Sequence, residues 1–259
     1  MNIRDNLYCG DCLEVMQDIP DASVDMVLCD LPYGILNKGN SNAKWDNVIP
    51  FEPLWKQYLR ICKDNAAIVL FASGMFTAKL MMSQPKLWRY NLIWDKVLST
   101  GFLNANRMPL RCHEDILVFY RRLPVYHPQM EKAAPHARNH SRGSKYKTPT
   151  NSCYGKFESM PTVISDEKFP RSIVRVSCVN RQEKKLHPSA KPVDLLRWLI
   201  RTYTDVNALV LDNCMGSGST CVAAIEENRH YIGIEKEQTF FDVACKRIKT
   251  ALQEPTLKF

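Results

Sequence analysis

Short apolar runs, each bounded by polar or turn residues, recur along most of the chain. They occupy residues 24–29, 66–71, 91–94, 115–120, 208–211 and 231–234. Runs with so little polar interruption are typical of strands that are buried on both faces of a sheet. Segments with helical spacing of apolar residues lie between several of them, at residues 54–62, 75–82, 196–203, 221–228 and 241–252. This alternation predicts an α/β fold in which a mainly parallel sheet carries helices on both faces.

The segment from Arg121 to Leu186 differs from the rest of the chain in amino-acid composition and in charge. It contains six prolines and few apolar runs other than residues 172–179, which indicates loops around a few strands. The whole chain has a net charge of +8, and this segment alone holds 14 basic and 5 acidic residues. The remainder of the chain is therefore close to neutral. Positive charge held in one segment favours a polyanionic partner.

Composition and cysteine usage limit the class of protein. The longest apolar run, residues 66–72, is far shorter than the roughly 18 residues of a membrane-spanning helix, and residues 1–8 carry charges where a signal peptide would be apolar. We therefore expect a cytoplasmic protein with no membrane partner. Its ten cysteines should be reduced thiols. Cys9 and Cys12 form the only Cys-x-x-Cys pair and lack the further ligands of a zinc site, so no metal is expected.

The most informative local signal is the sequence LVLDNCMGSGST at residues 209–220, where a predicted strand turns into a predicted helix. Gly216 and Gly218 allow backbone N–H groups to approach a ligand at the helix N-terminus. Glu235, about 20 residues further on, ends the next predicted strand, where a carboxylate can accept both hydroxyls of a ribose. The third glycine of the dinucleotide fingerprint is missing, which favours a nucleoside ligand without a pyrophosphate. A tight turn beside a surface Glu is the alternative interpretation.

A second signal is the sequence VLCDLPYG at residues 27–34, a buried strand that ends in an acid, a proline and an aromatic residue. Ligands of open parallel sheets bind at the carboxyl ends of the strands, so Asp30 lies where chemistry is expected. The alternative is that Asp30 is an ordinary turn residue and that residues 32–34 only lead the chain out of the strand.

These motifs together resemble those of the amino-methylating DNA methyltransferases that use S-adenosylmethionine, in the permuted order called the β group. Their catalytic tetrapeptide, (Asp, Asn or Ser)-Pro-Pro-(Tyr, Phe or Trp), is matched by Asp30-Leu31-Pro32-Tyr33. Their cofactor loop, Asp-Pro-Phe-x-Gly-Ser-Gly-Thr-Thr, is matched by residues 212–220, with Cys214 in place of the Phe. Further matches follow in the family's order at residues 10–12, 91–96, 113–117 and 187–192.

The resemblance implies a Rossmann-like methyltransferase fold. Its seven-stranded sheet would be mainly parallel with one antiparallel strand, and the chain would start in the middle of that sheet. Residues 1–120 would form the catalytic half, residues 187–259 the cofactor-binding half, and the basic segment, residues 121–186, an inserted target-recognition region. Double-stranded DNA would be the substrate. A homodimer and a restriction endonuclease are open as partners.

The resemblance also assigns roles to individual residues. The catalytic residues would be Asp30, Leu31, Pro32 and Tyr33. The cofactor S-adenosylmethionine would be held by Asp11, Asp30, Ser189, Lys191, Asp212, Cys214, Gly216, Ser217, Gly218, Ser219 and Glu235. Asp11 would bind the adenine amino group, Glu235 the ribose, and Ser189 with Lys191 the methionine carboxylate. An N-cap for Asp11 and a solvated surface position for Lys191 are the alternatives. Candidates for reading DNA bases are Arg138, Asn139, Arg142 and Asn151.

The implied reaction is methylation of the exocyclic amino group of a flipped-out adenine. Two acceptors, the Asp30 carboxylate and the Leu31 carbonyl, would draw the planar amine toward the tetrahedral geometry that attack requires. Cytosine-N4 methylation uses the same chemistry and is an alternative, but family members acting on cytosine more often carry Ser at the position of Asp30. A DNA-binding protein on a catalytically weak scaffold is a further alternative. Cytosine-C5 methylation is disfavoured because no proline in the chain is followed by Cys.

Overall fold

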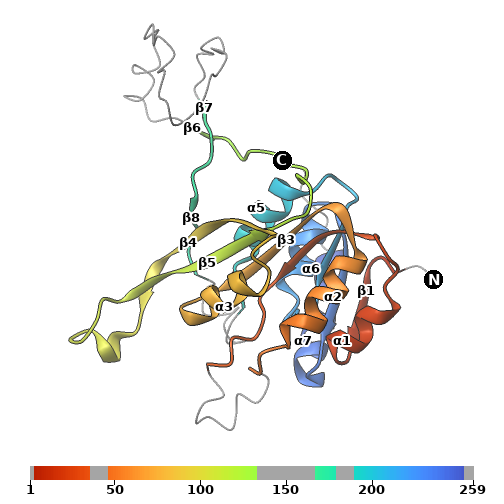
Figure 1. The fold of residues 1–259 in the computed structure, drawn as a ribbon, viewed down its shortest axis with the longest axis horizontal. Coiled ribbons are helices and arrows are strands. Elements are labelled where there is room, and N and C mark those ends of the chain that lie inside the picture. Colours follow the sequence, from red (N-terminus) through yellow and green to blue (C-terminus); the bar gives the residue numbers. More distant parts are fainter. Residues whose placement is uncertain (1–2, 36–45, 133–166, 179–189, 254–259) are drawn as a thin grey trace, which may run out of the picture. The chain divides into compact units, whose positions relative to one another are not determined.

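The computed structural model describes residues 3–35, 46–132, 167–178 and 190–253. Within these residues, eight strands form one sheet in the order β1-β10-β9-β2-β3-β5-β4-β8 (Figure 1). In that order they are β1 (Asn6–Cys9), β10 (His230–Glu235), β9 (Leu209–Asp212), β2 (Val24–Cys29), β3 (Cys62–Ala72), β5 (Arg111–Phe119), β4 (Trp88–Thr100) and β8 (Ile173–Arg175). Neighbouring strands are parallel except where β5 pairs with β3 and with β4. The six predicted strands and the mainly parallel sheet with one antiparallel strand are confirmed.

Two features of the sheet differ from the prediction. The described part of the sheet has eight strands where seven were predicted, because β8, from the Pro-rich basic segment, adds in parallel to β4. The prediction that the chain starts in the middle of the sheet is wrong, since β1 is the outermost strand, beside β10. The middle is taken by β2, which leads directly into Asp30. The carboxyl end of β2 is thus flanked by β9 on one side and β3 on the other.

Helices cover both faces of the sheet, as predicted (Figure 1). One face packs against α1 (Cys12–Val15), α2 (Phe51–Ile61) and α3 (Met75–Ser83), and the other against α5 (Val193–Tyr203), α6 (Ser219–Glu226) and α7 (Gln238–Gln253). Side chains alternate along a strand, so one apolar run serves both layers. In β2, Val27 and Cys29 join the first core, whereas Met26 and Leu28 join the second. None of the helices in the described residues combines the length and apolar character needed to cross a membrane.

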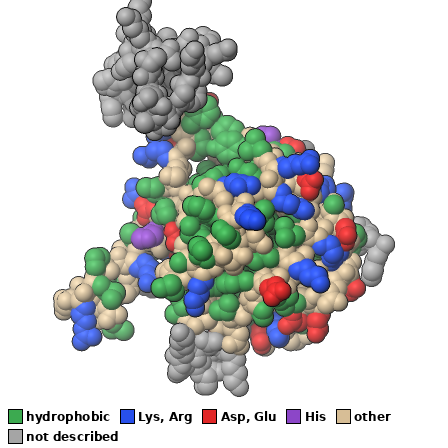
Figure 2. All heavy atoms as spheres, viewed as in Figure 1, with side chains coloured by type: hydrophobic (Ala, Val, Ile, Leu, Met, Phe, Trp, Pro, Cys, Tyr) green, Lys and Arg blue, Asp and Glu red, His purple; other side chains and the backbone are tan. Residues whose placement is uncertain are grey.

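β4 and β5 continue beyond the strands beside them. The pairing of β3 with β5 ends at Ala72 and Asp115, and β8 pairs with β4 at residues 93–95. Residues 96–114, the β4–β5 arm, therefore project from the sheet as a two-stranded hairpin, with the 3-10 turn Phe102–Asn104 at its tip. The arm is the yellow hairpin that extends away from the helices in Figure 1, and it protrudes from the surface in Figure 2.

The chain divides into two compact units, one made of Met1–His127 with Ser172–Phe259 and the other of Pro128–Arg171. The eight-stranded sheet and the helices named above belong to the first unit. In the second unit, β6 (Glu131–Lys132) pairs antiparallel with β7 (Glu167–Lys168), supported by an ion pair between Lys168 and Glu131 at 3.0 Å. The DNA-reading candidates Arg138, Asn139, Arg142 and Asn151 lie outside the described residues. Their roles, and the predicted domain boundaries, stay predictions.

Candidate active site

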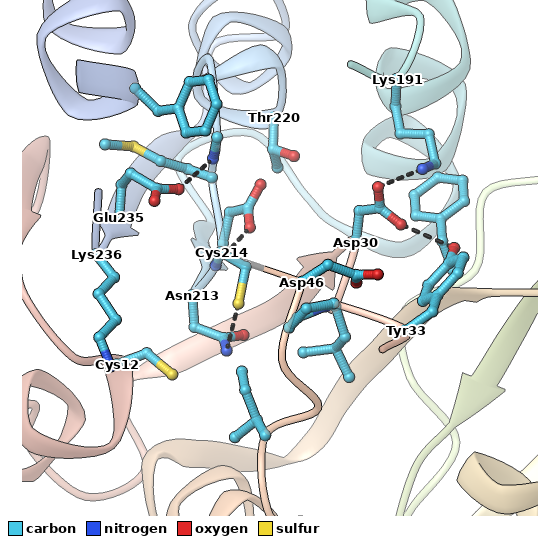
Figure 3. A pocket seen from close by; sticks show the side chains of 18 of the residues that line it. Cys12, Asp30, Tyr33, Asp46, Lys191, Asn213, Cys214, Thr220, Glu235 and Lys236 are labelled. Atoms are coloured by element: carbon cyan, nitrogen blue, oxygen red, sulfur yellow. Dashed lines mark hydrogen bonds and ion pairs between the residues drawn. The ribbon is translucent and has the colours of Figure 1, made fainter. Parts of the chain in front are cut away.

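Four acidic side chains lie around one cavity, where neighbouring parallel strands end. Asp11 follows β1, Glu235 ends β10, Asp212 ends β9 and Asp30 follows β2, and these strands are consecutive in the sheet. Parallel strands have their carboxyl ends at one edge of a sheet, and all four residues line one cavity of about 510 Å³. This volume lies in the usual range of small-molecule sites. Figure 3 shows Glu235 at one end of the pocket and Asp30 at the other, with Cys214 between them.

Glu235 is held by the loop that precedes α6. Its Oε2 accepts a hydrogen bond from the backbone N–H of Gly216 at 2.9 Å, and its Oε1 accepts one from the N–H of Glu237 at 2.8 Å. Gly216 has a φ of +51°, a conformation that favours glycine. Burial raises the pKa of Glu235, although the backbone N–H groups favour its ionised form. The predicted glycine turn and the predicted acid therefore meet directly at the cavity.

Asp11 both caps α1 and lines the cavity. Its Oδ1 accepts a hydrogen bond from the N–H of Leu13 at 2.9 Å, which confirms the N-cap interpretation. Its Oδ2 pairs with Nζ of Lys236 at 3.0 Å. The cap fixes the orientation of the carboxylate and engages one oxygen only. Capping is therefore compatible with a ligand contact, which stays a prediction for Asp11.

The loop after β9 is stabilised by polar contacts that the sequence did not suggest. Asp212 is 4% exposed and accepts a hydrogen bond from the N–H of Cys214 at 3.1 Å. The side chains of Thr220 and Cys29 favour its ionised form. Burial raises its pKa to about 6. Asn213, at a position where the resemblance expects proline, accepts the hydroxyl of Tyr58 at 2.6 Å. The buried side chain of Asn213 thus ties the loop to α2.

At the other end of the cavity, Asp30 is contacted on both carboxylate oxygens. The hydroxyl of Tyr33 donates to Oδ1 at 2.8 Å, and Nζ of Lys191 pairs with Oδ2. Nζ of Lys191 also lies 3.5 Å from Oε2 of Glu114, whose Oε1 pairs with Nζ of Lys96. Figure 3 shows Lys191 and Tyr33 approaching Asp30 from two sides. Two cations and two anions thus form one chain of ion pairs at the cavity wall.

Burial and the ion pairs act in opposite directions on the pKa values of these groups. Lys191 is 8% exposed, which excludes a solvated surface position for it. Burial raises the pKa of Asp30, and the adjacent Lys191 opposes that rise. Burial would also raise the pKa of Glu114, but Lys191 and Lys96 hold it below the ordinary value. The pKa of Lys191 is raised because its two carboxylate neighbours outweigh the cost of burial. Lys191 therefore stays charged and favours the ionised form of both carboxylates.

Comparison with known proteins identifies the family. A model of the DNA methylase family matches residues 24–246, which include both the strand before Asp30 and the loop after β9. The chain belongs to this DNA methylase family. Its curated relatives include the type II methyltransferase M2.MboI of Moraxella bovis, which is 28% identical over 265 residues, covering 93% of this chain and 86% of the relative.

Solved structures support the fold of this methylase. The crystal structure of an M1.HpyAVI complex with SAM has a TM-score of 0.64 and 23% identity, and the match covers 94% of this chain and 98% of that chain. The cytosine-N4-specific PvuII DNA methyltransferase has a TM-score of 0.65 and 15% identity, with 96% and 91% covered. At these identities, the likeness establishes the Rossmann-like methyltransferase fold.

The structure of the methylase brings most of the predicted site residues to the cavity. Those that line it are Asp11, Asp30, Leu31, Pro32, Tyr33, Lys191, Asp212, Cys214, Gly216, Ser217, Ser219 and Glu235. Gly218 is set back, with a φ of +76° at the start of α6, where an added Cβ would lie 3.2 Å from Cβ of Ala244. Gly218 therefore allows α6 to approach α7 closely. Ser189 lies outside the described residues.

The ion-pair chain includes two residues that had no role in the sequence-based prediction. Lys96 and Glu114 both line the cavity and complete the ion-pair chain to Lys191. They lie in segments 91–96 and 113–117, which match the family's motif order, so the motif matches marked their positions but not their function. Their pairing depends on the antiparallel register of β4 and β5, which places Asp95 opposite His113.

The raised pKa of Asp212 predicts a pH dependence of folding stability for the methylase. Since the folded protein holds this proton up to about pH 6 and the unfolded chain releases it near pH 4, the contribution of Asp212 is complete below pH 4 and lost as the pH rises through 6. Relative to Asp212→Asn, the free energy of unfolding of the wild type should fall by up to about 3 kcal/mol between pH 4 and pH 7.

Urea unfolding of both proteins at several pH values measures this difference. Asp194→Asn is the matched control for removal of a carboxylate, since the Asp194 side chain is 82% exposed. A difference for Asp212→Asn that does not change with pH would contradict the raised pKa of Asp212.

Proposed function

We propose that this methylase transfers a methyl group from S-adenosylmethionine to the exocyclic amino group of an adenine that has been flipped out of double-stranded DNA. The observation that carries the proposal is the Asp30 carboxyl group, paired with Lys191 at the wall of a nucleoside-sized cavity. A carboxylate in that position accepts hydrogen bonds from an amino group and favours the positive charge that develops on its nitrogen.

The donor groups of the cavity fit S-adenosylmethionine, which supplies an electrophilic methyl group when bound. Glu235 at the end of β10 would accept the ribose hydroxyls, and Asp11 beside it would accept the adenine amino group. Asp212 and the backbone of residues 214–219 would surround the methionine part, with Ser189 as a further predicted contact. The M1.HpyAVI structure with the same fold is a complex with SAM. The match to this family supports the same ligand here.

Asp30 and its neighbours would activate the target amine. Its nitrogen lone pair is delocalised into the ring, so the amine attacks well only when two acceptors draw it out of planarity. Oδ1 of Asp30 and the carbonyl of Leu31 would be these acceptors. Oδ1 now accepts the hydroxyl of Tyr33, which must release it as the base enters and the Tyr33 ring stacks on it. The nitrogen would gain the methyl group as the S–CH3 bond of the donor breaks and leaves a neutral thioether, and it would lose one proton, which Asp30 would accept.

The preference for adenine over cytosine rests on Asp30. Family members that act on cytosine more often carry Ser at this position, and the chain has Asp. Cytosine-N4 methylation stays the alternative, since the PvuII enzyme with the same fold is named cytosine-N4-specific. A restriction endonuclease partner is proposed because the M2.MboI relative is named a type II methyltransferase. A homodimer stays a prediction.

The test is transfer of radioactive methyl from S-adenosylmethionine to unmethylated genomic DNA, followed by digestion to nucleosides. We expect the label in N6-methyldeoxyadenosine. Label in N4-methyldeoxycytidine would assign the cytosine alternative. If the protein retains DNA but transfers no label, the catalytically weak scaffold is the better description. Sequencing of the methylated DNA would then supply the recognition site.

A further inference from the structure

The β4–β5 arm exposes apolar side chains at its tip. Leu103 is 101% exposed, Phe102 is 69% exposed and Met108 is 58% exposed. A two-stranded ribbon without neighbours is only marginally stable in water, so apolar residues at its tip do not help it to fold. Exposed apolar side chains gathered at a projection instead indicate a surface that contacts a partner.

The charge of the arm favours a polyanionic partner. Residues 97–112 contain no Asp or Glu, whereas Arg107 and Arg111 are basic and exposed. Asn104 and Asn106, also at the tip, add hydrogen-bonding groups that carry no charge. Figure 2 shows hydrophobic and basic side chains together on the projecting hairpin. Apolar groups flanked by cations fit a nucleic acid. Its phosphates can pair with the cations, and its stacked bases can contact the apolar side chains.

The base of the arm belongs to the catalytic cavity. Thr100 and Arg111 pair across the two strands of the arm, and both line the cavity together with Lys96 and Glu114. The hydroxyl of Thr100 donates to the carbonyl of Arg111 at 3.3 Å, which closes the hairpin at this point. The arm therefore starts at the site that would receive the target base, and a duplex presenting that base would lie within its reach.

We propose that the β4–β5 arm binds the DNA duplex beside the target base and that Phe102 and Leu103 enter the space from which the base is flipped. This inference rests on the proposed function. Flipping costs a few kcal/mol of stacking and pairing, and an apolar side chain inserted into the stack recovers part of it. Arg107 and Arg111 would contact phosphates and fix the position of the arm. A two-stranded ribbon is narrow enough to enter a DNA groove.

The test compares wild type with the double variant Phe102→Ala, Leu103→Ala on two duplexes that contain the site mapped with the wild type. One duplex is fully paired, and the other carries an abasic site opposite the target base, which lowers the cost of flipping. The double variant should methylate the paired duplex at least about tenfold more slowly, since tenfold corresponds to about 1.4 kcal/mol of the flipping cost. On the abasic duplex the rates should differ by less than about threefold.

Leu252→Ala is the matched control, because Leu252 is 61% exposed on α7 and should leave both rates unchanged. An unchanged rate for the double variant on the paired duplex, or the same loss on both duplexes, would overturn the proposal. So would a wild-type dimer that becomes monomeric in the double variant, measured by sedimentation, since the tip would then contact a second copy.

If the wild type itself methylates no DNA, the proposed function fails. The proposal that the arm binds DNA is then tested by DNA binding alone. Fluorescence anisotropy with the paired duplex then compares the same proteins. Weaker binding by the double variant would support the DNA contact, and equal binding would overturn it.

Discussion

Asp30→Ala is expected to abolish methyl transfer while leaving retention of DNA nearly intact. The carboxylate is the group that accepts the amino hydrogens, and removing such a group costs about a thousandfold in kcat. We expect binding of the duplex to depend instead on cations such as Arg107 and those of the basic segment, residues 121–186, which the substitution does not touch. Single-turnover methylation of the mapped site and a filter-binding assay measure the two quantities on the same preparation.

Asp194→Ala provides the matched control for Asp30→Ala, because its carboxylate is 82% exposed and does not line the cavity. This control should retain full activity. If the Asp30→Ala variant still methylates DNA at more than about a tenth of the wild-type rate, Asp30 takes no part in the chemical step. Loss of both activity and DNA retention would point to a folding defect, which the thermal midpoint detects.

Lys191→Met is expected to move the acid limb of the pH profile of kcat upward by at least about one pH unit. Without Lys191, Asp30 loses the cation paired with it and still faces the negative charge of Glu114, so its pKa rises further. At a pH on the acid limb the variant should therefore be about tenfold slower than the wild type, and it should regain activity as the pH increases. The charged and titratable groups around Asp30 are Lys191, Glu114, Tyr33, Cys29 and Asp212.

A second substitution separates electrostatics from simple disruption. Adding Glu114→Gln to Lys191→Met removes the carboxylate that repels Asp30. The acid limb of the pH profile should then move part of the way back toward its wild-type position. Lys56→Met, on the exposed side of α2, is the matched control and should leave the profile unchanged.

The same measurement distinguishes two roles of Lys191. If Lys191 serves the methionine carboxylate instead, as the family resemblance implies, Lys191→Met would raise the KM for S-adenosylmethionine without moving the pH profile. That result would contradict its role beside Asp30. The structure favours the ion pair because Nζ of Lys191 contacts Asp30 and lies 3.5 Å from Glu114.

Local pattern was sufficient for most elements of the fold. The run before Asp30 became β2, and the run before Asp212 became β9, because almost uninterrupted apolar residues can be buried on both faces of a parallel sheet. Glu235 and Gly216 were predicted to lie close together, because both follow the carboxyl ends of parallel strands and those ends lie at the same edge of the sheet. β1 was missed because Asn6–Cys9 is short and only partly buried, so its pattern does not differ from that of a loop.

The sequence by itself determined the family, the order of the motifs and the positions of Asp30 and Glu235 at the ends of strands. These follow from short-range spacing, which is readable along the chain. Only the tertiary structure decided that Lys191 reaches Asp30 and that Lys96 and Glu114 extend this pairing, since the partners are separated by up to 161 residues. It also decided that residues 96–114 form an arm at the mouth of the cavity, because the neighbouring strands end before it. Contacts of this kind depend on register and strand order, which no local pattern encodes.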